Sequence, residues 1–556
     1  MKKHFKTSFL LVLFVLINHT LSFGQLYEDG IPEFTRADTL RGALSPLRTC
    51  YDIKHYNLDI EVFPEEKTIK GSNQFLFKAE KDFRKLQFDL FDNLLVDSII
   101  YKGNLLPYER EYNAVFIKFP STITKSSIDS FTVYFSGKPI VAKNAPWDGG
   151  VIWGKDNNGI DFIATACQGL GASAWWPNKD HQSDEVDSML LTVTVPDPLQ
   201  NISNGKLLKT EKPNDKTTKY YWEIKNPINN YNVALNIGDY AHFQEQYQGI
   251  DGPLEIDYYP LKENQNKIEH LKTNVITMLE AFEHWFGPYP FYQDGYKIVE
   301  TPHLGMEHQS AIAYGNKYLN GYLGRDNSGS GWGKKWDFII IHESGHEWFG
   351  NNITAKDIGD MWIHESFTNY SEALYIEYFY GKKAGQEYIY GNRRGILNDR
   401  PLRGPLGVNY SGSGDMYLKG GVMLNQLRRI IADDTLWRNI LTGLNVDFRH
   451  QTVDYDDVVD YIIAKTKMNL APFFEQYVLQ KDIPTLELKL LKDGTAEARW
   501  NSEVENFEMP IHLGIRETEF QKINLTQEFQ KLPWNNIHKD KLLIDTFNYY
   551  INVTYL

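Results

Sequence analysis

The stretch Phe338-Ile-Ile-Ile-His-Glu-Ser-Gly-His-Glu-Trp-Phe-Gly350 contains a His-Glu-x-x-His pattern that decides how the rest of the chain is interpreted. Residues four apart share one face of a helix, so His342 and His346 can present their imidazoles to one metal ion. Glu343 lies one step round the helix and can reach a metal-bound water without being a ligand itself. The spacing predicts a zinc site, but two histidines packed in a core would produce the same pattern.

A catalytic zinc usually has three protein ligands and one open position. Glu365 follows His346 by 19 residues and is the candidate third ligand. We predict a helix from Asp360, as its N-cap, to Phe379, with Gly381 ending it. Two helices joined by a short connection can fold back on each other. The sequence therefore predicts one zinc ion held by these three residues, with Glu343 as the base that takes a proton from water and passes it to a leaving amine.

Upstream of this site the pattern is that of β-strands. Apolar residues alternate with polar ones from Tyr56 to Val62, which is the period of a half-buried strand. Similar runs recur at 190–195 and 220–224, with turn residues such as Asn204-Gly205 between runs. We predict an N-terminal antiparallel β domain over residues 25–243.

The pattern becomes helical near residue 260. Apolar residues recur at helical spacing from Ile268 to Phe282, and Gly287-Pro288 ends the run. We predict a mostly helical domain over 244–481, interrupted by a mobile Gly/Ser-rich loop at 327–333. Period-two alternation returns after Ile483-Pro484, with a hairpin turn at Asp493-Gly494. Residues 482–556 therefore predict a small β-sandwich-like domain, and the whole chain a multidomain α+β fold.

The first 24 residues resemble a signal peptide. Lys2, Lys3 and Lys6 precede an apolar run from Phe9 to Ile17 that is too short to span a bilayer, and small residues follow before Gln25. We expect residues 1–24 to be removed and the protein to be exported, to the periplasm or outside the cell. An uncleaved N-terminal anchor is the alternative. No other stretch is long and apolar enough to predict a membrane span in the mature chain.

Composition excludes some functions. The chain has 42% hydrophobic and 23% charged residues and a formal net charge of −14, which becomes more negative when three lysines leave with the signal peptide. A chain this acidic repels phosphates, so we expect no nucleic-acid partner. Two cysteines, Cys50 and Cys167, are too few for a disulfide scaffold and lack the spacing of a structural zinc site.

At this point the sequence resembles the gluzincin aminopeptidases, relatives of aminopeptidase N and leukotriene-A hydrolase. The resemblance rests on four motifs in the right order: the zinc helix from His342 through Trp-Phe-Gly-Asn351, the spacing to Glu365, Gly305-Met306-Glu307-His308 upstream, and Tyr417-Leu-Lys-Gly-Gly421 downstream. It implies that residues 244–481 form a thermolysin-like catalytic domain.

The resemblance also implies roles for residues outside the metal site. Glu307, within the substrate-binding stretch that includes Gly305 and Met306, would bind the free α-ammonium of a peptide. Tyr417 would donate its phenol proton to a developing oxyanion. Gln168 resembles a glutamine of the β domain that helps to hold the amine. From the residues alone, Glu307 could equally be an exposed strand carboxylate and Tyr417 a packed aromatic.

The chain departs from the family pattern in three respects. His308 replaces the asparagine of the Gly-x-Met-Glu-Asn motif, and Glu347 replaces a common glutamine. Larger members carry a further C-terminal helical domain that covers the site, and none follows residue 556, so we expect a more open cleft.

The resemblance implies a zinc-dependent aminopeptidase acting on peptides with a free N-terminus, by attack of water on a zinc-polarised carbonyl. An open-cleft zinc endopeptidase and a non-catalytic peptide-binding relic are the alternatives.

Overall fold

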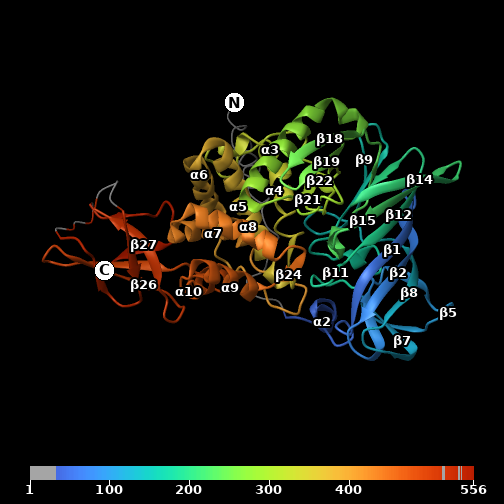
Figure 1. The fold of residues 1–556 in the computed structure, drawn as a ribbon, viewed down its shortest axis with the longest axis horizontal. Coiled ribbons are helices and arrows are strands. Elements are labelled where there is room, and N and C mark those ends of the chain that lie inside the picture. The colour runs from blue at the N-terminus through green and yellow to red at the C-terminus, as the bar shows by residue number, and fades with distance from the viewer. Residues whose placement is uncertain (1–32, 516–519, 536, 538, 540) are drawn as a thin grey trace, which may run out of the picture. The chain divides into compact units, whose positions relative to one another are not determined.

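The computed structural model describes residues 33–515, 520–535, 537, 539 and 541–556 (Figure 1). The predicted signal peptide at 1–24 lies outside the described residues. Residues 37–556 form one compact unit. Within the described part, no helix has the length and apolar character needed to cross a membrane.

The N-terminal region is built of β-sheets, and the alternating run from Tyr56 to Val62 lies in its longest strand. The main sheet has the order β14-β15-β12-β1-β2-β8-β4-β5. Its strands are β1 (Tyr51–Phe63), β2 (Thr68–Ala79), β4 (Leu94–Tyr101), β5 (Asn104–Leu105), β8 (Ile128–Gly137), β12 (Met189–Pro196), β14 (Lys206–Asn214) and β15 (Thr217–Ile224).

The prediction of a purely antiparallel domain is wrong in one place, because β1 pairs in parallel with β12, Tyr56 opposite Met189. Parallel neighbours need a crossover connection, and here the chain between them builds β2 to β11 first. Alternation reveals a strand but not its partner, so the sequence could not show this pairing.

Smaller sheets complete the region. They are β3 (Phe83–Asp89), β7 (Ala114–Ile123) and β6 (Tyr108–Glu111); β13 (Gln200–Ile202), β17 (Asn236–Gly238), β10 (Asp161–Ala166) and β9 (Gly150–Lys155); and β11 (Glu185–Val186) with β16 (Ile228–Asn229). A short helix, α2 (Arg36–Gly42), precedes them. The two cysteines, Cys50 and Cys167, are both buried in this region and are not joined.

The middle of the chain contains one sheet and most of the helices. The sheet has the order β18-β19-β20-β22-β21, so the two-residue strand β21 (Gly305–Met306) lies at its edge. The other strands are β18 (Phe243–Gly249), β19 (Gly252–Tyr259), β20 (Tyr296–Glu300) and β22 (Ile312–Tyr314). The helices are α3 (Ile268–Phe286), α4 (Phe338–Gly345), α5 (Trp362–Tyr380), α6 (Lys382–Asn392), α7 (Leu418–Ile431), α8 (Asp434–Asp447), α9 (Tyr455–Thr466) and α10 (Ala471–Phe474). A short parallel pair, β23 (Ile353–Ala355) with β24 (Gln451–Val453), follows the zinc-motif segment.

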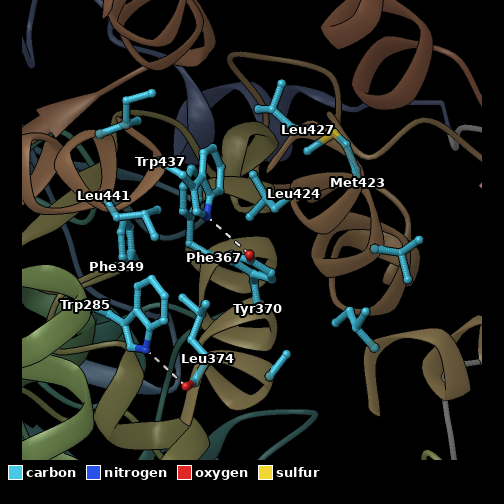
Figure 2. Close-up of a cluster of buried hydrophobic side chains, with 14 of the residues drawn as sticks. Trp285, Phe349, Phe367, Tyr370, Leu374, Met423, Leu424, Leu427, Trp437 and Leu441 are labelled. Carbon is cyan, nitrogen blue, oxygen red and sulfur yellow. Dashed lines mark hydrogen bonds between the residues drawn. The ribbon is translucent and has the colours of Figure 1, made fainter. Parts of the chain in front are cut away.

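Large buried side chains from several neighbouring segments pack against helix α5 (Figure 2). The indole of Trp437, from α8, donates to the hydroxyl of Tyr370 (3.2 Å), and that of Trp285, from α3, donates to the Leu374 carbonyl (3.1 Å). Phe349 stacks on Phe367 with ring centroids 4.5 Å apart. Because aromatic side chains bury the most apolar surface, these contacts fix the helix that carries Glu365.

The predicted boundaries of α5 need one correction. Gly381 (φ +90°) ends the helix, as expected, but Asp360 is not its N-cap. Asp360 belongs to a short 3₁₀ turn, η5 (Ile358–Asp360), and its carboxylate accepts from the Trp362 indole (3.0 Å) instead of from the first backbone N–H groups of α5. Because the Asp360 carboxylate bonds the Trp362 indole, it does not cap the helix.

The C-terminal strands form two sheets, with orders β29-β26-β25-β31 and β28-β27-β30. The strands are β25 (Thr485–Leu490), β26 (Ala496–Asn501), β27 (Met509–Gly514), β28 (Gln521–Leu525), β29 (Gln530–Lys531), β30 (Leu543–Ile544) and β31 (Asn552–Tyr555). Gly494 (φ +81°) makes the turn between β25 and β26 that Asp493-Gly494 predicts. The sandwich arrangement of these sheets stays a prediction.

Candidate active site

The zinc-motif helix α4 is short and begins at a well-defined cap. The Asp337 carboxylate accepts from the backbone N–H groups of Ile339 (3.1 Å) and Ile340 (3.4 Å), which have no partner inside the helix. Asp337 is itself buried and also accepts from the Tyr314 hydroxyl (2.7 Å) on β22. The helix ends at Gly345, so His346 is its C-cap. The sheet therefore fixes where the helix starts, and the helix places both histidines.

Hydrogen bonds at the far side of each imidazole turn the two histidines toward Glu365. Nδ1 of His342 pairs with Glu372 Oε1 (2.7 Å), and Nδ1 of His346 pairs with the Phe349 carbonyl (3.0 Å). A ring nitrogen that donates to a carboxylate or carbonyl leaves the other nitrogen as a metal ligand. In both rings, Nε2 is the free nitrogen.

Three ligand atoms converge as a zinc ion requires. Glu365 Oε2 lies 3.8 Å from Nε2 of His342 and 3.4 Å from Nε2 of His346. Zinc ligands at about 2.0–2.2 Å in a tetrahedron lie about 3.3–3.5 Å apart. Glu365 is 1% exposed, and among the described residues its Oε2 has no hydrogen-bond partner. A buried carboxylate oxygen without a donor needs a cation, so these residues fit one zinc ion.

Glu343 is buried and lies against the edge strand. A Cβ added to Gly305 would be 2.8 Å from Glu343 Oε1 and 2.7 Å from Ile339 Cγ2. Only glycine lets β21 approach the helix this closely. Burial, with Glu307 nearby, raises the pKa of Glu343 to about 7. A carboxylate with that pKa is suited to accept and return a proton near neutral pH.

Glu307 lies beside the metal site and is 2% exposed, so it is not an exposed strand carboxylate. Its Oε1 accepts from Gln168 Nε2 (2.6 Å) and from the Tyr231 hydroxyl (3.0 Å). Gln168 Nε2 also contacts Glu365 Oε1 (3.2 Å), so it links the β region to both carboxylates. Oxygens of Glu307 and Glu343 and a ring nitrogen of His346 all lie within 4.8 Å of one another.

Tyr417 reaches the site because α7 packs very closely on α5. A Cβ on Gly420 would be 1.9 Å from the Ser366 hydroxyl oxygen, and one on Gly421 would be 2.3 Å from Asn369 Oδ1. This contact places the Tyr417 ring nearly parallel to the His342 ring, with centroids 6.1 Å apart. Burial and the nearby carboxylate of Glu365 raise the pKa of Tyr417 well above its ordinary value. The phenol is therefore a proton donor at neutral pH.

His308, which departs from the family motif, is fully buried. Within the described part of the chain, neither ring nitrogen has a hydrogen-bond partner, and burial lowers the pKa of His308 to about 3. It is therefore a neutral, buried side chain in the turn that follows the edge strand.

Two residues that the sequence analysis missed contact the site. Glu372 supports His342, and Tyr231 holds Glu307. Glu372 follows Glu365 by seven residues, which is two helical turns, so the same face of the predicted helix could have revealed it. Tyr231 comes from the short turn η2 (Asn230–Asn232), and no local pattern marks it.

Two histidines from the zinc-motif segment and a glutamate from a second helix, with a buried glutamate beside them, form the arrangement that zinc-dependent hydrolases of the His-Glu-x-x-His class use.

The comparison with known proteins agrees with this class: residues 271–477 match the Peptidase family M1 domain. Residues 271–477 are therefore similar to an M1 peptidase domain, and the clustered His342, His346 and Glu365 fit the zinc ion for which the structural neighbours are named.

Curated relatives are distant and longer. The chain is 23% identical over 283 residues to endoplasmic reticulum aminopeptidase 1 of Mus musculus, covering 49% of this chain and 29% of that protein. It is 26% identical over 307 residues to aminopeptidase N of Lactobacillus helveticus, covering 50% and 34%. The matched stretches thus span about a third of these two relatives.

Solved structures share the fold over more of the chain. An M1 zinc metallopeptidase from Deinococcus radiodurans has a TM-score of 0.64 at 19% identity, covering 78% of this chain and 95% of that one. A mutant of the same enzyme bound to a Tyr-Ser-Ala substrate has a TM-score of 0.64 at 18% identity, with the same coverage.

Proposed function

We propose that the protein is an aminopeptidase that removes N-terminal residues from peptides. The observation that carries the proposal is the placement of Glu307, a buried carboxylate beside the candidate metal ligands. Among the described residues, its hydrogen bonds come from two neutral donors and from no cation. Buried charge needs compensation, and a substrate ammonium would supply it. An amine held there lies close enough to the metal site for the first peptide bond to reach it.

Each residue then has a definite task. Glu307 binds the α-ammonium, with Gln168 and Tyr231 fixing the carboxylate. The outer edge of β21 offers backbone groups to an extended peptide. When bound by His342, His346 and Glu365, zinc supplies Lewis acidity that polarises a carbonyl and lowers the pKa of water.

Glu343 takes the proton from the attacking water and delivers it to the leaving amine. Tyr417 donates a hydrogen bond where negative charge develops on the carbonyl oxygen. Its protonated phenol lies next to the ring of His342, one of the candidate metal ligands.

The relatives support this proposal, because those matched include proteins named as aminopeptidases, and a structural neighbour is described with a peptide substrate. The non-catalytic alternative is not favoured, since the base, the phenol and all three ligands are present together. The endopeptidase alternative is not favoured either, because an internal peptide segment has no charge to place against buried Glu307.

Export is also part of the proposal. It rests on the lysines, the apolar run and the small residues of the first 24 positions. Sequencing the N-terminus of the protein recovered from its natural source tests it: a chain beginning at Gln25 supports export, and one that keeps residues 1–24 contradicts cleavage.

The function is tested with paired peptides that differ only in an N-terminal acetyl group. We expect release of the first residue from the free peptide, no cleavage of the acetylated one, and loss of activity with a zinc chelator. Glu307→Gln should lower kcat/KM for the free peptide on the order of tenfold to hundredfold, since a charge-assisted bond to the ammonium is lost. Glu280→Gln, an exposed carboxylate on α3, is the control. Equal cleavage of both peptides would refute the proposal.

A further inference from the structure

The turn that follows Glu307 has an unusual backbone. After β21 the chain passes through His308 and Gln309 to Ser310, whose φ is +56°, and then enters β22. A non-glycine residue in the left-handed region costs free energy and persists only where its surroundings impose it. The turn is therefore held from outside. From the β region, Asn204 Nδ2 donates to the Gln309 carbonyl (2.7 Å), and the Gly205 N–H donates to Ser310 Oγ (2.9 Å). Two further partners lie just past the second zinc-ligating histidine.

Glu347, next to His346, is the first of these partners. It is fully buried, and both of its carboxylate oxygens are used. Its Oε1 accepts from the backbone N–H of Ser310 (2.9 Å), and its Oε2 accepts from the Tyr289 hydroxyl (2.7 Å). The segment that carries a zinc ligand thus directly fixes the strained residue of the turn.

Asn351 is the second partner, and it joins three parts of the chain. Its Nδ2 donates to the Glu307 backbone carbonyl (2.8 Å) and to Glu347 Oε1 (3.1 Å). Its Oδ1 accepts from Asn232 Nδ2 (2.8 Å). Asn232 adjoins Tyr231, whose hydroxyl contacts the Glu307 carboxylate. Asn351 therefore bonds the backbone of Glu307, Tyr231 bonds its carboxylate, and Asn232 links the two partners.

We propose that Glu347 and Asn351 are positioning residues that set where Glu307 lies relative to the zinc ligands. Neither residue belongs to the clustered ligand set His342, His346 and Glu365. They tie the turn after Glu307 to the segment that follows His346, so the amine-binding carboxylate and the metal keep a fixed separation. That separation decides which peptide bond reaches the metal. The inference rests on the proposed role of Glu307 in binding a free amine.

The test compares two substitutions at one position with a matched control. Glu347→Gln keeps an acceptor for Ser310 and Asn351, and its amide can donate to the Tyr289 hydroxyl, which in turn donates to the Gly295 carbonyl (3.2 Å). Glu347→Met keeps the length but removes the acceptor of the Ser310 N–H and one of the two acceptors of Asn351 Nδ2.

The control is Glu283→Met. Glu283 is another buried glutamate with three donors, from Ile250 N (2.9 Å), Tyr289 N (3.0 Å) and the Tyr292 hydroxyl (2.8 Å), and none of them belongs to the turn. One of these donors belongs to Tyr289, whose hydroxyl also bonds Glu347. The contacts of Glu347 with Ser310 and Asn351 stay in place, so the variant reports what loss of a buried carboxylate does while the turn remains held.

The readout is binding of two inhibitors to the zinc-loaded protein: an α-amino hydroxamate and the same hydroxamate without its amine. Their affinity ratio measures the amine site independently of turnover. We expect Glu347→Met to reduce the ratio on the order of tenfold and to raise KM more than it lowers kcat. Zinc content should be unchanged. Glu347→Gln should keep the ratio within about twofold, and Glu283→Met should leave it unchanged even if the melting temperature falls.

Three outcomes would contradict the inference. One is a Glu347→Met variant that binds zinc and keeps the wild-type ratio. Another is a Glu347→Gln variant that loses as much of the ratio as the Met variant. The third is an equal loss in Glu283→Met. If Glu347→Met does not fold, Asn351→Ser applies the same test, because serine is too short to reach the Glu307 carbonyl.

Failure of the inference can be told apart from failure of the proposed function. If Glu307→Gln itself leaves the inhibitor ratio unchanged, the amine role of Glu307 is wrong and the inference falls with it. If Glu307→Gln abolishes the preference and Glu347→Met does not, only the positioning role is wrong.

Discussion

Replacing Glu372 with Gln should weaken zinc binding while leaving all three ligands in place. The Glu372 carboxylate accepts from His342 Nδ1 (2.7 Å), from the Tyr388 hydroxyl (2.6 Å) and from Asn369 Nδ2 (3.2 Å to each oxygen). Glutamine keeps the shape but offers one acceptor oxygen and no charge. The imidazole then loses the anionic partner that fixes its orientation and raises its basicity.

The expected size follows from these contacts. Loss of one such outer carboxylate typically reduces metal affinity tenfold to hundredfold, which is about 1.4–2.8 kcal/mol. We place this variant toward the lower end, because Tyr388 can reorient and accept from the new amide. Glu372→Ala, which removes every acceptor, should lie toward the upper end.

The assay is competition for zinc with a chelator of known affinity, together with activity as a function of free zinc. Excess zinc should restore most of the activity of the Gln variant. Glu377→Gln, on the same helix but paired with Arg428 (2.7 and 2.8 Å), is the control and should change stability without changing zinc affinity. Zinc affinity equal to wild type in Glu372→Ala would refute the reasoning.

Three further results are expected. Glu343→Gln should retain zinc and lose on the order of a hundredfold or more in kcat, measured with a saturating peptide, because the proton acceptor is gone; an active variant would remove Glu343 from the mechanism. Gly305→Ala should lower kcat with zinc content unchanged, because the new methyl displaces Glu343, whereas Gly414→Ala, which meets no atom within 4 Å, should not. Burial lowers the pKa of Lys297 to about 8. The unfolded chain therefore binds more protons than the folded one between about pH 8 and 10.4. The free-energy cost of burying the charged amine is complete below pH 8 and shrinks as the pH rises through that window. Denaturant unfolding at pH 7.5 and 9.5 should show wild type gaining up to about 2 kcal/mol relative to Lys297→Met, and parallel pH curves would contradict it.

The convergence of the three candidate ligands was predictable because its information is local. His342 and His346 lie on one helix, and Glu365 lies on the next, so helical periodicity is enough to bring their side chains together. The edge-strand residues and Tyr417 needed the resemblance, since nothing in their own neighbourhood distinguishes them from other strand or helix-end residues. The structure gives a physical reason for the glycines of two motifs. A side chain at Gly305 would collide with Glu343, and one at Gly420 would collide with Ser366.

What the sequence could not show depends on contacts between distant segments. The parallel pairing of β1 with β12 joins strands more than a hundred residues apart. Tyr231 meets Glu307 across 76 residues, and Asn232 meets Asn351 across 119. The N-cap predicted at Asp360 failed for a related reason, since Trp362 and Arg403 take up its carboxylate. Without the fold, the sequence does not show which of several possible partners a polar side chain will bond.

Several parts of the candidate site depend on helix α5 and are expected to form or be lost together. It carries the zinc ligand Glu365 and the carboxylate that supports His342, and through Ser366 and Asn369 it determines where α7 places the Tyr417 phenol. The candidate ligand Glu365, the carboxylate that orients His342 and the placement of the Tyr417 phenol therefore belong to one cooperative unit of the fold. Any fluctuation that opens α5 removes all three at once. Zinc binding should consequently slow amide hydrogen exchange along α5, because zinc binds only the closed form, while exchange in the N-terminal sheets stays unchanged.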